Sequence, residues 1–340
     1  MARRPIAVIA ACLFTVGLSG LPGADRKTAE PRPLPQDRPP AAAGGTPVVD
    51  AACLAAARVA RPADRLARGL EPYAPTRQDV LRMEADLGAY LDEHGELRGG
   101  AATRRAAVNV PTWVHVINNG AQQLPRQKVL DQIAALNSAY SGRLGGADTR
   151  VRFRLDGITT TNNAAWFGNP LGYEKAMKTR LRRGGAGTLN LYIAQLNEVV
   201  LGYSTYPFAY AASPVKDGVV VDWRSMPGGS LSGFDKGFTA VHEIGHWLGL
   251  LHTFENGCAE PGDGVADTPA QATPTGGCPS GKDTCPEPGE DHVHNFMDYS
   301  HDRCMTSFTR GQAARMHATW AAYRGTNRTL RLTGDSTNGS

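Results

Sequence analysis

The sequence has no long hydrophobic run after its first 24 residues. No later stretch reaches the ~20 apolar residues that a membrane-spanning helix needs, so we expect no stable membrane association. Charge of one sign is also scarce: the formal net charge is only +4 in 340 residues, which does not favour nucleic acid as a partner. Internal repeats are absent, which argues against a repeat architecture. The remaining composition, 41% hydrophobic and 20% charged, is that of a globular protein able to bury a sizeable core.

The N-terminus has the pattern of an export signal. Arg3 and Arg4 precede an apolar core, "IAVIAACLFTVGL", and small residues follow up to a predicted cleavage near Ala24. The alternative is a lipoprotein, because "IAAC" ending at Cys12 resembles a lipobox. Cys12 lies in the middle of the apolar core, which favours residues 1–24 as a signal peptide and a secreted, extracellular protein.

The chain beyond the signal divides into three parts. Residues 25–105 begin with a linker rich in proline and alanine, continue with helical patterns at 51–60 and 76–93, and end in a polar connector with a predicted cleavage site at Arg104 or Arg105. Residues 106–325 form the main domain, and residues 326–340 form a tail. In the main domain, helical and strand patterns alternate, which predicts a mixed α/β fold. The strands are expected at 108–117, 151–155, 188–193, 201–207 and 218–223, and the helices at 125–140, 173–183, from about 237, and from 309.

The segment "HEIGHWLGLLH" carries the strongest chemical signal. On an α-helix His242 and His246 lie one turn apart on the same face, so both imidazoles can bind one metal ion, with Glu243 beside it. An uninterrupted helix would carry His252 about 9 Å further along the axis and onto another face. Gly249 can adopt the left-handed conformation that ends a helix, which would return His252 to the metal as a third ligand. This leaves one open position, as catalytic zinc sites require.

This motif resembles that of the metzincin metallopeptidases, and "NFMDY" supplies the expected methionine turn with Met297 and, two residues on, Tyr299. The segments "GVVVDWRSMPGG", "GDGVADTP" and "NFMDYSHDRCMTSFTRGQAARM" extend the resemblance to the pappalysin family, which includes ulilysin. It covers roughly residues 108–325 and implies a metzincin-type catalytic domain with a twisted, mostly parallel sheet, an active-site helix and an irregular disulfide-bonded C-terminal subdomain.

The resemblance also implies a reaction. A zinc ion on the three histidines would activate a water, Glu243 would act as the general base, and Tyr299 would donate to the oxyanion. The segment 201–207 would be the strand along the cleft rim, to which an extended peptide could add. The expected activity is that of a secreted zinc endopeptidase acting on extracellular proteins or peptides and made as a zymogen, with 25–105 as linker and prosegment. The oligomeric state cannot be predicted.

Cysteines and acidic residues cluster after the motif. Between Glu255 and Asp302 the chain has ten acidic residues and one base, Lys282. Asp263 and Asp267 are candidate calcium ligands on the resemblance, although a solvated acidic loop is the alternative and the number of ions stays open. Spacing alone allows three pairings of the four clustered cysteines, and the resemblance implies Cys258–Cys285 and Cys278–Cys304.

Two further questions concern the control and the specificity of the site. Cys53 is the candidate zymogen switch, because a thiolate from a prosegment could fill the open zinc position; the alternative is a cysteine with no role. The resemblance implies that the segment containing Asp302 and Arg303 lines the pocket for the residue after the scissile bond. If Arg303 points inward, acidic residues would be preferred, and if Asp302 does, basic ones would be.

Two other functions compete with peptide hydrolysis. One is an extracellular binding module that holds a metal without cutting, which the presence of Glu243 disfavours. The other is hydrolysis of a non-peptide amide, which the rim strand and prosegment disfavour.

Overall fold

The computed structural model describes residues 71–94, 106–197 and 199–325. The predicted signal peptide, the helix at 51–60, Cys53, the cleavage site at Arg104 or Arg105 and the tail lie outside these residues. None of the helices in the described ranges is long and apolar enough to cross a membrane.

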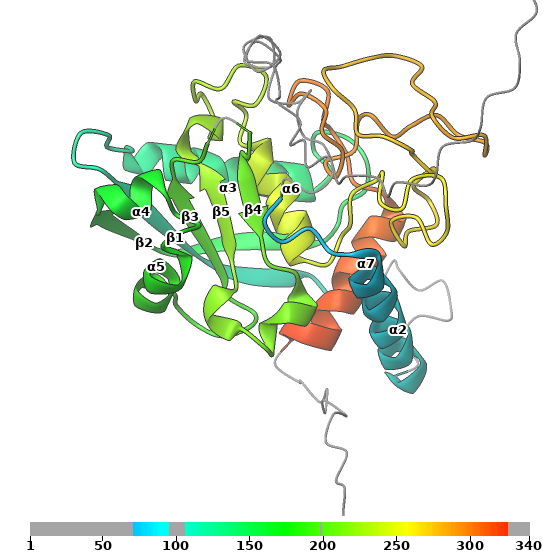
Figure 1. The fold of residues 1–340 in the computed structure, drawn as a ribbon, viewed down its shortest axis with the longest axis horizontal. Helices are drawn as coiled ribbons and strands as arrows, with labels where there is room; N and C mark the ends of the chain where they lie inside the picture. Colours follow the sequence, from blue (N-terminus) through cyan, green and yellow to red (C-terminus); the bar gives the residue numbers. More distant parts are fainter. Residues whose placement is uncertain (1–70, 95–105, 198, 326–340) are drawn as a thin grey trace, which may run out of the picture. The chain divides into compact units, whose positions relative to one another are not determined.

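Five strands form one sheet in the order β2-β1-β3-β5-β4 (Figure 1). Strands β2, β1, β3 and β5 run parallel to one another. The short β4 lies at the edge and pairs with β5 in the antiparallel sense. The strands are β1 (Val108–Asn118), β2 (Val151–Asn162), β3 (Leu189–Ala194), β4 (Gly202–Ser204) and β5 (Val219–Asp222). The mostly parallel sheet of a mixed α/β domain is therefore confirmed.

Helices and helical turns connect these strands and cover both faces of the sheet. The helices are α2 (Arg77–His94), α3 (Arg126–Tyr140), α4 (Ala164–Gly168), α5 (Glu174–Leu181), α6 (Phe238–Trp247) and α7 (Arg310–Thr319). The short turns are η3 (Pro207–Tyr210), η4 (Pro214–Lys216), η5 (Trp223–Ser225) and η6 (Trp320–Arg324).

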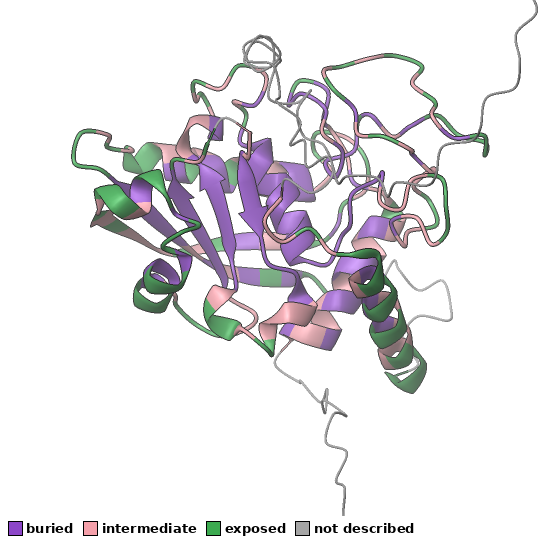
Figure 2. Cartoon of the chain, in the orientation of Figure 1, coloured by how far each residue is buried: buried purple, intermediate pink, exposed green. Residues whose placement is uncertain are grey.

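The two largest apolar clusters of the core lie on opposite faces of the sheet. Side chains of α3 and α6 pack with one face in the larger cluster, whereas α4 and α5 supply Phe167, Met177 and Leu181 to a smaller cluster on the other face. Figure 2 shows that the buried residues run through the central strands and α6. Every residue of α6 is buried, so its polar side chains need partners inside the protein.

Two local differences from the expected elements have clear causes. Strand β2 continues to Asn162 instead of ending at 155, because its second half pairs with β1 after a register shift at Thr112/Trp113. Helix α4 has too few residues to show a helical period. It begins because the Asn163 side chain accepts a hydrogen bond from the Trp166 amide.

Between α6 and α7 the chain forms no regular helix or strand, apart from one isolated bridge between Asn295 and Ser307. Two disulfides cross-link this region, Cys258–Cys285 and Cys278–Cys304. They are the pairs that the family resemblance implies.

A buried ion pair supports the C-terminal end of α6. The Arg324 guanidinium donates to Asp217 at 3.1 Å and to the Trp247 carbonyl at 2.8 Å, and both charged side chains are 0% exposed. Trp247 Nε1 also donates to Asp217 at 3.2 Å. Removing one member of such a pair leaves the other charge buried and uncompensated.

We therefore expect Arg324→Met to lower the free energy of unfolding by about 3–5 kcal/mol, measured by urea denaturation. The matched control is Arg154→Met, which removes an arginine from an exposed pair with Asp156. That control should leave the unfolding midpoint unchanged. Equal midpoints for the two variants would show that the buried pair does not stabilise the fold.

Candidate active site

Helix α6 presents the first two histidines of the motif. It begins after Gly237, whose φ of +80° is left-handed, and both His242 and His246 are buried on it. Between them, Gly245 lies against Met297: a Cβ on this glycine would be 2.4 Å from the methionine sulfur. The methionine turn therefore packs directly against the helix face between the two histidines, and any larger residue at 245 would push them apart.

Gly249 ends this helical segment and redirects the chain. Its φ is +95°, and a Cβ there would lie 2.5 Å from the Thr319 side chain of α7. After this turn His252 returns to the other two rings. Its Nε2 atom is 3.1 Å from Nε2 of His246, which is itself 3.0 Å from Nε2 of His242. The structure thus brings the three predicted ligands together.

Hydrogen bonds on the far side of two rings fix their orientation. Nδ1 of His242 donates to the Phe296 carbonyl at 2.7 Å, and Nδ1 of His246 donates to the Leu250 carbonyl at 2.8 Å. These bonds place the proton on Nδ1 and leave the Nε2 lone pair free to bind a metal.

The residues present fit a zinc ion. Two neutral imidazoles cannot hydrogen-bond through facing lone pairs, so a cation between the Nε2 atoms would stabilise their approach. Nitrogen ligands about 2.0–2.1 Å from zinc lie roughly 3.3 Å apart in tetrahedral geometry, close to the observed separations. Burial lowers the pKa of His242 to about 4, which favours the neutral form that coordinates metals.

Glu243 lies beside the histidines at the β4 edge of the sheet. A Cβ on Gly202 would be 2.6 Å from the Glu243 side chain, so this glycine gives the glutamate its space. Its Oε2 atom is buried and has no hydrogen-bond partner among the described residues. Burial, and then the charge of the nearby Glu71, raise the pKa of Glu243 above its usual range. An unpaired carboxylate with a raised pKa suits a group that accepts and returns a proton.

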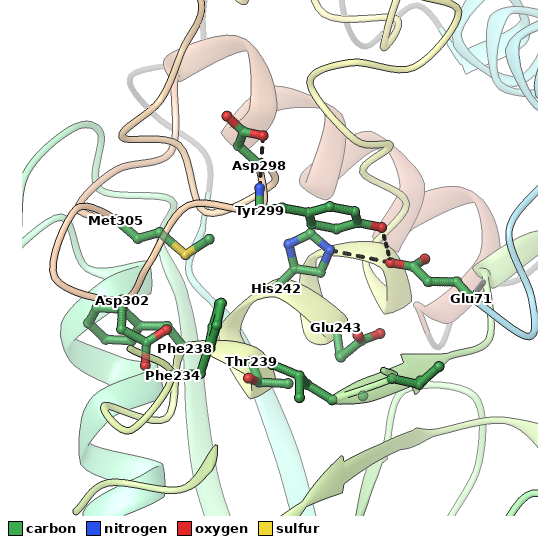
Figure 3. A pocket seen from close by; sticks show the side chains of 13 residues that line it. Glu71, Phe234, Phe238, Thr239, His242, Glu243, Asp298, Tyr299, Asp302 and Met305 are labelled. Atoms are coloured by element: carbon green, nitrogen blue, oxygen red, sulfur yellow. Dashed lines mark hydrogen bonds and ion pairs between the residues drawn. The ribbon is translucent and has the colours of Figure 1, made fainter. Parts of the chain in front are cut away.

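Tyr299 faces the same point from the methionine turn. Its hydroxyl lies 3.1 Å from Nε2 of His252, and Figure 3 shows the ring beside His242. Burial raises the pKa of Tyr299 well above its usual value, so the hydroxyl keeps its proton and can donate it in a hydrogen bond.

A fourth residue, Glu71, faces the histidines and was not predicted. Its Oε1 atom accepts from Tyr299 Oη at 2.5 Å and lies 3.0 Å from His252 Nε2. Its carboxylate is also 4.0 Å from His242 Nε2 and 3.9 Å from His246 Nε2. Glu71 and the three histidines form one group of potential metal ligands. No motif in the sequence marks Glu71.

Tyr206 is a second residue that sequence reasoning missed. Its hydroxyl lies 2.8 Å from Nδ1 of His246, and it comes from the segment 201–207 that was expected only as a rim strand. The strand itself is shorter, Gly202–Ser204, because Tyr206 leads into η3.

The adjoining pocket is lined by apolar side chains together with acidic ones, among them Asp302. Asp302 is 2% exposed and lies near Phe234 and Phe238 in Figure 3. Burial raises its pKa to about 7. Arg303 is exposed and does not line the pocket. The lining residues are Glu71, Val200, Leu201, Gly202, Phe234, Phe238, Thr239, His242, Glu243, Asp298, Tyr299, Asp302 and Met305.

The two candidate calcium ligands have different surroundings. Asp263 is buried, accepts from the Val265 amide and the Thr268 hydroxyl through Oδ1, and leaves Oδ2 without a partner among the described residues. Asp267 is exposed and accepts from the Gly311 amide at the start of α7. In the described ranges, they do not join a group of three or more His, Cys, Asp or Glu ligand atoms. A calcium ion here stays a prediction.

Comparisons with known proteins agree with this geometry. Residues 190–321 match the Peptidase_M43 family, described as pregnancy-associated plasma protein-A. An extracellular metalloprotease of Verticillium alfalfae is 44% identical in an alignment of 240 residues that covers 67% of this chain and 81% of that one. Extracellular metalloprotease 1 of Coccidioides posadasii is 42% identical over 236 residues, 67% of this chain and 83% of that one.

Solved structures extend the similarity to three dimensions. Mature mirolysin of Tannerella forsythia in complex with a cleaved peptide has a TM-score of 0.57 and 30% identity, covering 63% of this chain and 92% of that one. A mutant of promirolysin from the same organism has a TM-score of 0.61 and 28% identity, covering 72% of this chain and 89% of that one. The precursor form therefore matches a larger share of this chain than the mature form does.

Proposed function

The chain belongs to the pappalysin family of metzincin zinc metallopeptidases, and from that premise we propose that it is a secreted endopeptidase whose zinc ligands are His242, His246 and His252. The observation that carries the proposal is the convergence of three Nε2 atoms: that of His246 lies 3.0 Å from that of His242 and 3.1 Å from that of His252. Beside them is the buried Glu243, whose Oε2 atom has no hydrogen-bond partner among the described residues. Relatives named extracellular metalloproteases support secretion.

The roles of the side chains follow from their positions. Zinc, when bound, supplies Lewis-acid polarisation of the scissile carbonyl and of the attacking water. Glu243 accepts the proton of that water and returns it to the leaving amine, because its Oε2 atom has no competing partner among the described residues and its pKa is raised. Tyr299 donates its hydroxyl hydrogen bond to the oxygen that gains negative charge. Met297 supports the site from below through its contact with Gly245.

The position of β4 supports cutting within extended peptides. Among the described strands, β4 pairs only with β5 and lies at the end of the sheet, next to Glu243. An extended substrate could therefore add to its free edge through main-chain hydrogen bonds. A set of peptides blocked at both ends, given to the processed enzyme, tests this: we expect internal cuts that a zinc chelator abolishes. A folded, zinc-loaded and processed protein that cuts none of them would favour the metal-holding binding module.

Asp302 supports a preference for lysine or arginine after the scissile bond. It lies near Phe234 and Phe238, on the side of the pocket away from Glu71 (Figure 3), whereas Arg303 is exposed and is not a lining residue. The carboxylate of Asp298, which also lines the pocket, already accepts from the Thr275 amide and the Gln271 side chain. The carboxylate of Asp302 accepts from the Lys236 amide at 2.7 Å, which holds it in place.

We expect Asp302→Asn to lower kcat/KM for peptides with a basic residue at this position by roughly 10–100-fold, the worth of a hydrogen bond to a charged group. Peptides with leucine there serve as the control and should change little. Because the pKa of Asp302 is about 7, its carboxylate ionises as pH rises through neutrality, so the basic-to-leucine ratio should increase from pH 6 to 8 in the wild type. A ratio that neither pH nor the substitution changes would contradict this assignment.

Calcium binding is also part of the proposal. Asp263 has a buried Oδ2 without a partner among the described residues, and burial raises its pKa to about 7. A cation would stabilise its ionised form, and backbone carbonyls of the same loop could complete the oxygen ligands.

A further inference from the structure

The side chain that faces the three histidines comes from outside the catalytic domain. Glu71 precedes the domain by more than thirty residues in sequence, yet its carboxylate lies 3.0 Å from His252 Nε2 and accepts from Tyr299 Oη. Carboxylate oxygens are regular zinc ligands, and a three-histidine site has one position left. Glu71 therefore stands where substrate and water would have to bind.

Tyr73 holds the residues next to Glu71 against the catalytic domain. Its hydroxyl donates to Glu174, which also forms a buried ion pair with Lys178 on α5. The Tyr73 ring packs against Tyr203 of β4, the proposed substrate-binding strand. The segment 71–73 thus follows the same edge that an extended peptide would use.

Helix α2 anchors the segment on the other side. Val80 and Met83 pack with Tyr206 and Leu251 in one apolar cluster. Glu84 forms an ion pair with Arg315 of α7 at 2.5 Å. Arg315 also donates to the Gly249 carbonyl at 2.8 Å, in the turn that positions His252. The helix is therefore tied to the same loop that builds the metal site.

We propose that in the uncut chain Glu71 is the fourth zinc ligand and keeps the enzyme latent, with Tyr73 and α2 holding it in place. This rests on the proposed zinc site. Glu71 would exclude the attacking water from the metal and, by accepting from Tyr299, would also engage the group that should stabilise the oxyanion. Cys53, the thiolate candidate for the same role, lies outside the described residues. Glu71 and Cys53 cannot both bind, because a zinc ion held by three histidines has one further coordination position. The two candidates therefore lead to opposite expectations for the variants below.

The test uses the full chain in a Glu243→Gln background, so that self-cutting cannot remove the segment, with Co²⁺ replacing zinc as a visible probe. The variants are Glu71→Gln, Glu71→Ala and Cys53→Ala. Glu71→Ala is included because the amide oxygen of glutamine could still coordinate weakly. Glu93→Gln is the matched control, since it makes the same change at an exposed site on α2. The measurements are the Co²⁺ absorption spectrum and the Kd of acetohydroxamic acid for the bound metal.

We expect both Glu71 variants to change the spectrum and to lower the Kd of acetohydroxamic acid at least tenfold, because a tethered ligand competes at a millimolar or higher effective concentration. Cys53→Ala and Glu93→Gln should behave as the parent does. If both Glu71 variants bind Co²⁺ with an unchanged spectrum and Kd, Glu71 is not the fourth ligand, although the three-histidine site stands. The same conclusion holds if Cys53→Ala alone changes the spectrum and lowers the Kd of acetohydroxamic acid. Failure of every form to bind Co²⁺ would overturn both the role of Glu71 and the proposed function.

Discussion

Glu243→Gln should lower kcat for peptide cleavage about 10²–10⁴-fold, the usual contribution of a positioned general base. The amide keeps the size of the side chain in the space that Gly202 leaves for it, but it cannot accept the proton. Because the proposed zinc ligands are the three histidines and not Glu243, the variant should retain its zinc. The assay is steady-state cleavage by the processed enzyme, together with metal content per chain.

Glu290→Gln is the control for this experiment, because it makes the same change at an exposed residue of the acidic loop. It should leave kcat and zinc content unchanged. If Glu243→Gln cut peptides at the wild-type rate, another group would have to accept the proton. If it lost both zinc and activity, Glu243 would act on metal binding instead of on the chemistry.

Tyr299→Phe should lower kcat by about 10²–10³-fold, as removal of one oxyanion donor typically does. The ring keeps its packing against His252 and Phe254, so folding and zinc content should not change. Since the hydroxyl acts on charge that develops during the reaction, KM should change far less than kcat.

Tyr173→Phe is the matched control, because Tyr173 is 44% exposed and is not among the residues that line the pocket beside Tyr299. A loss confined to KM would mean that Tyr299 binds the substrate without stabilising the transition state. An unchanged kcat would remove Tyr299 from the mechanism.

The convergence of the three histidines could be predicted because its determinants are local in sequence. Helical spacing places His242 and His246 together, and one glycine with positive φ returns His252 to them. These features depend on backbone geometry within eleven residues. The family resemblance extended the prediction to Met297 and Tyr299. It also implied the two disulfide pairings, which the spacing of the cysteines alone left open.

The remaining features depend on contacts between distant segments. Glu71 reaches His252 across 181 positions of sequence, and nothing in its neighbours marks it as a ligand. Asp302 and Arg303 are adjacent, and which of the two lines the pocket depends on contacts with distant residues, such as the hydrogen bond from the Lys236 amide to Asp302. The full length of β2 likewise depends on its pairing with β1. Patterns within one segment carry no information on such partners.

The number of zinc ions that restore cutting tests the three-histidine site most directly. The processed enzyme is stripped with a chelator, titrated with Zn²⁺ and assayed on a peptide blocked at both ends, in parallel with His252→Ala. We expect activity to disappear on chelation and to return in full at one zinc per chain, with no return in the variant at that stoichiometry. Full cutting by the stripped enzyme, or equal recovery in His252→Ala, would contradict a zinc peptidase built on these three histidines.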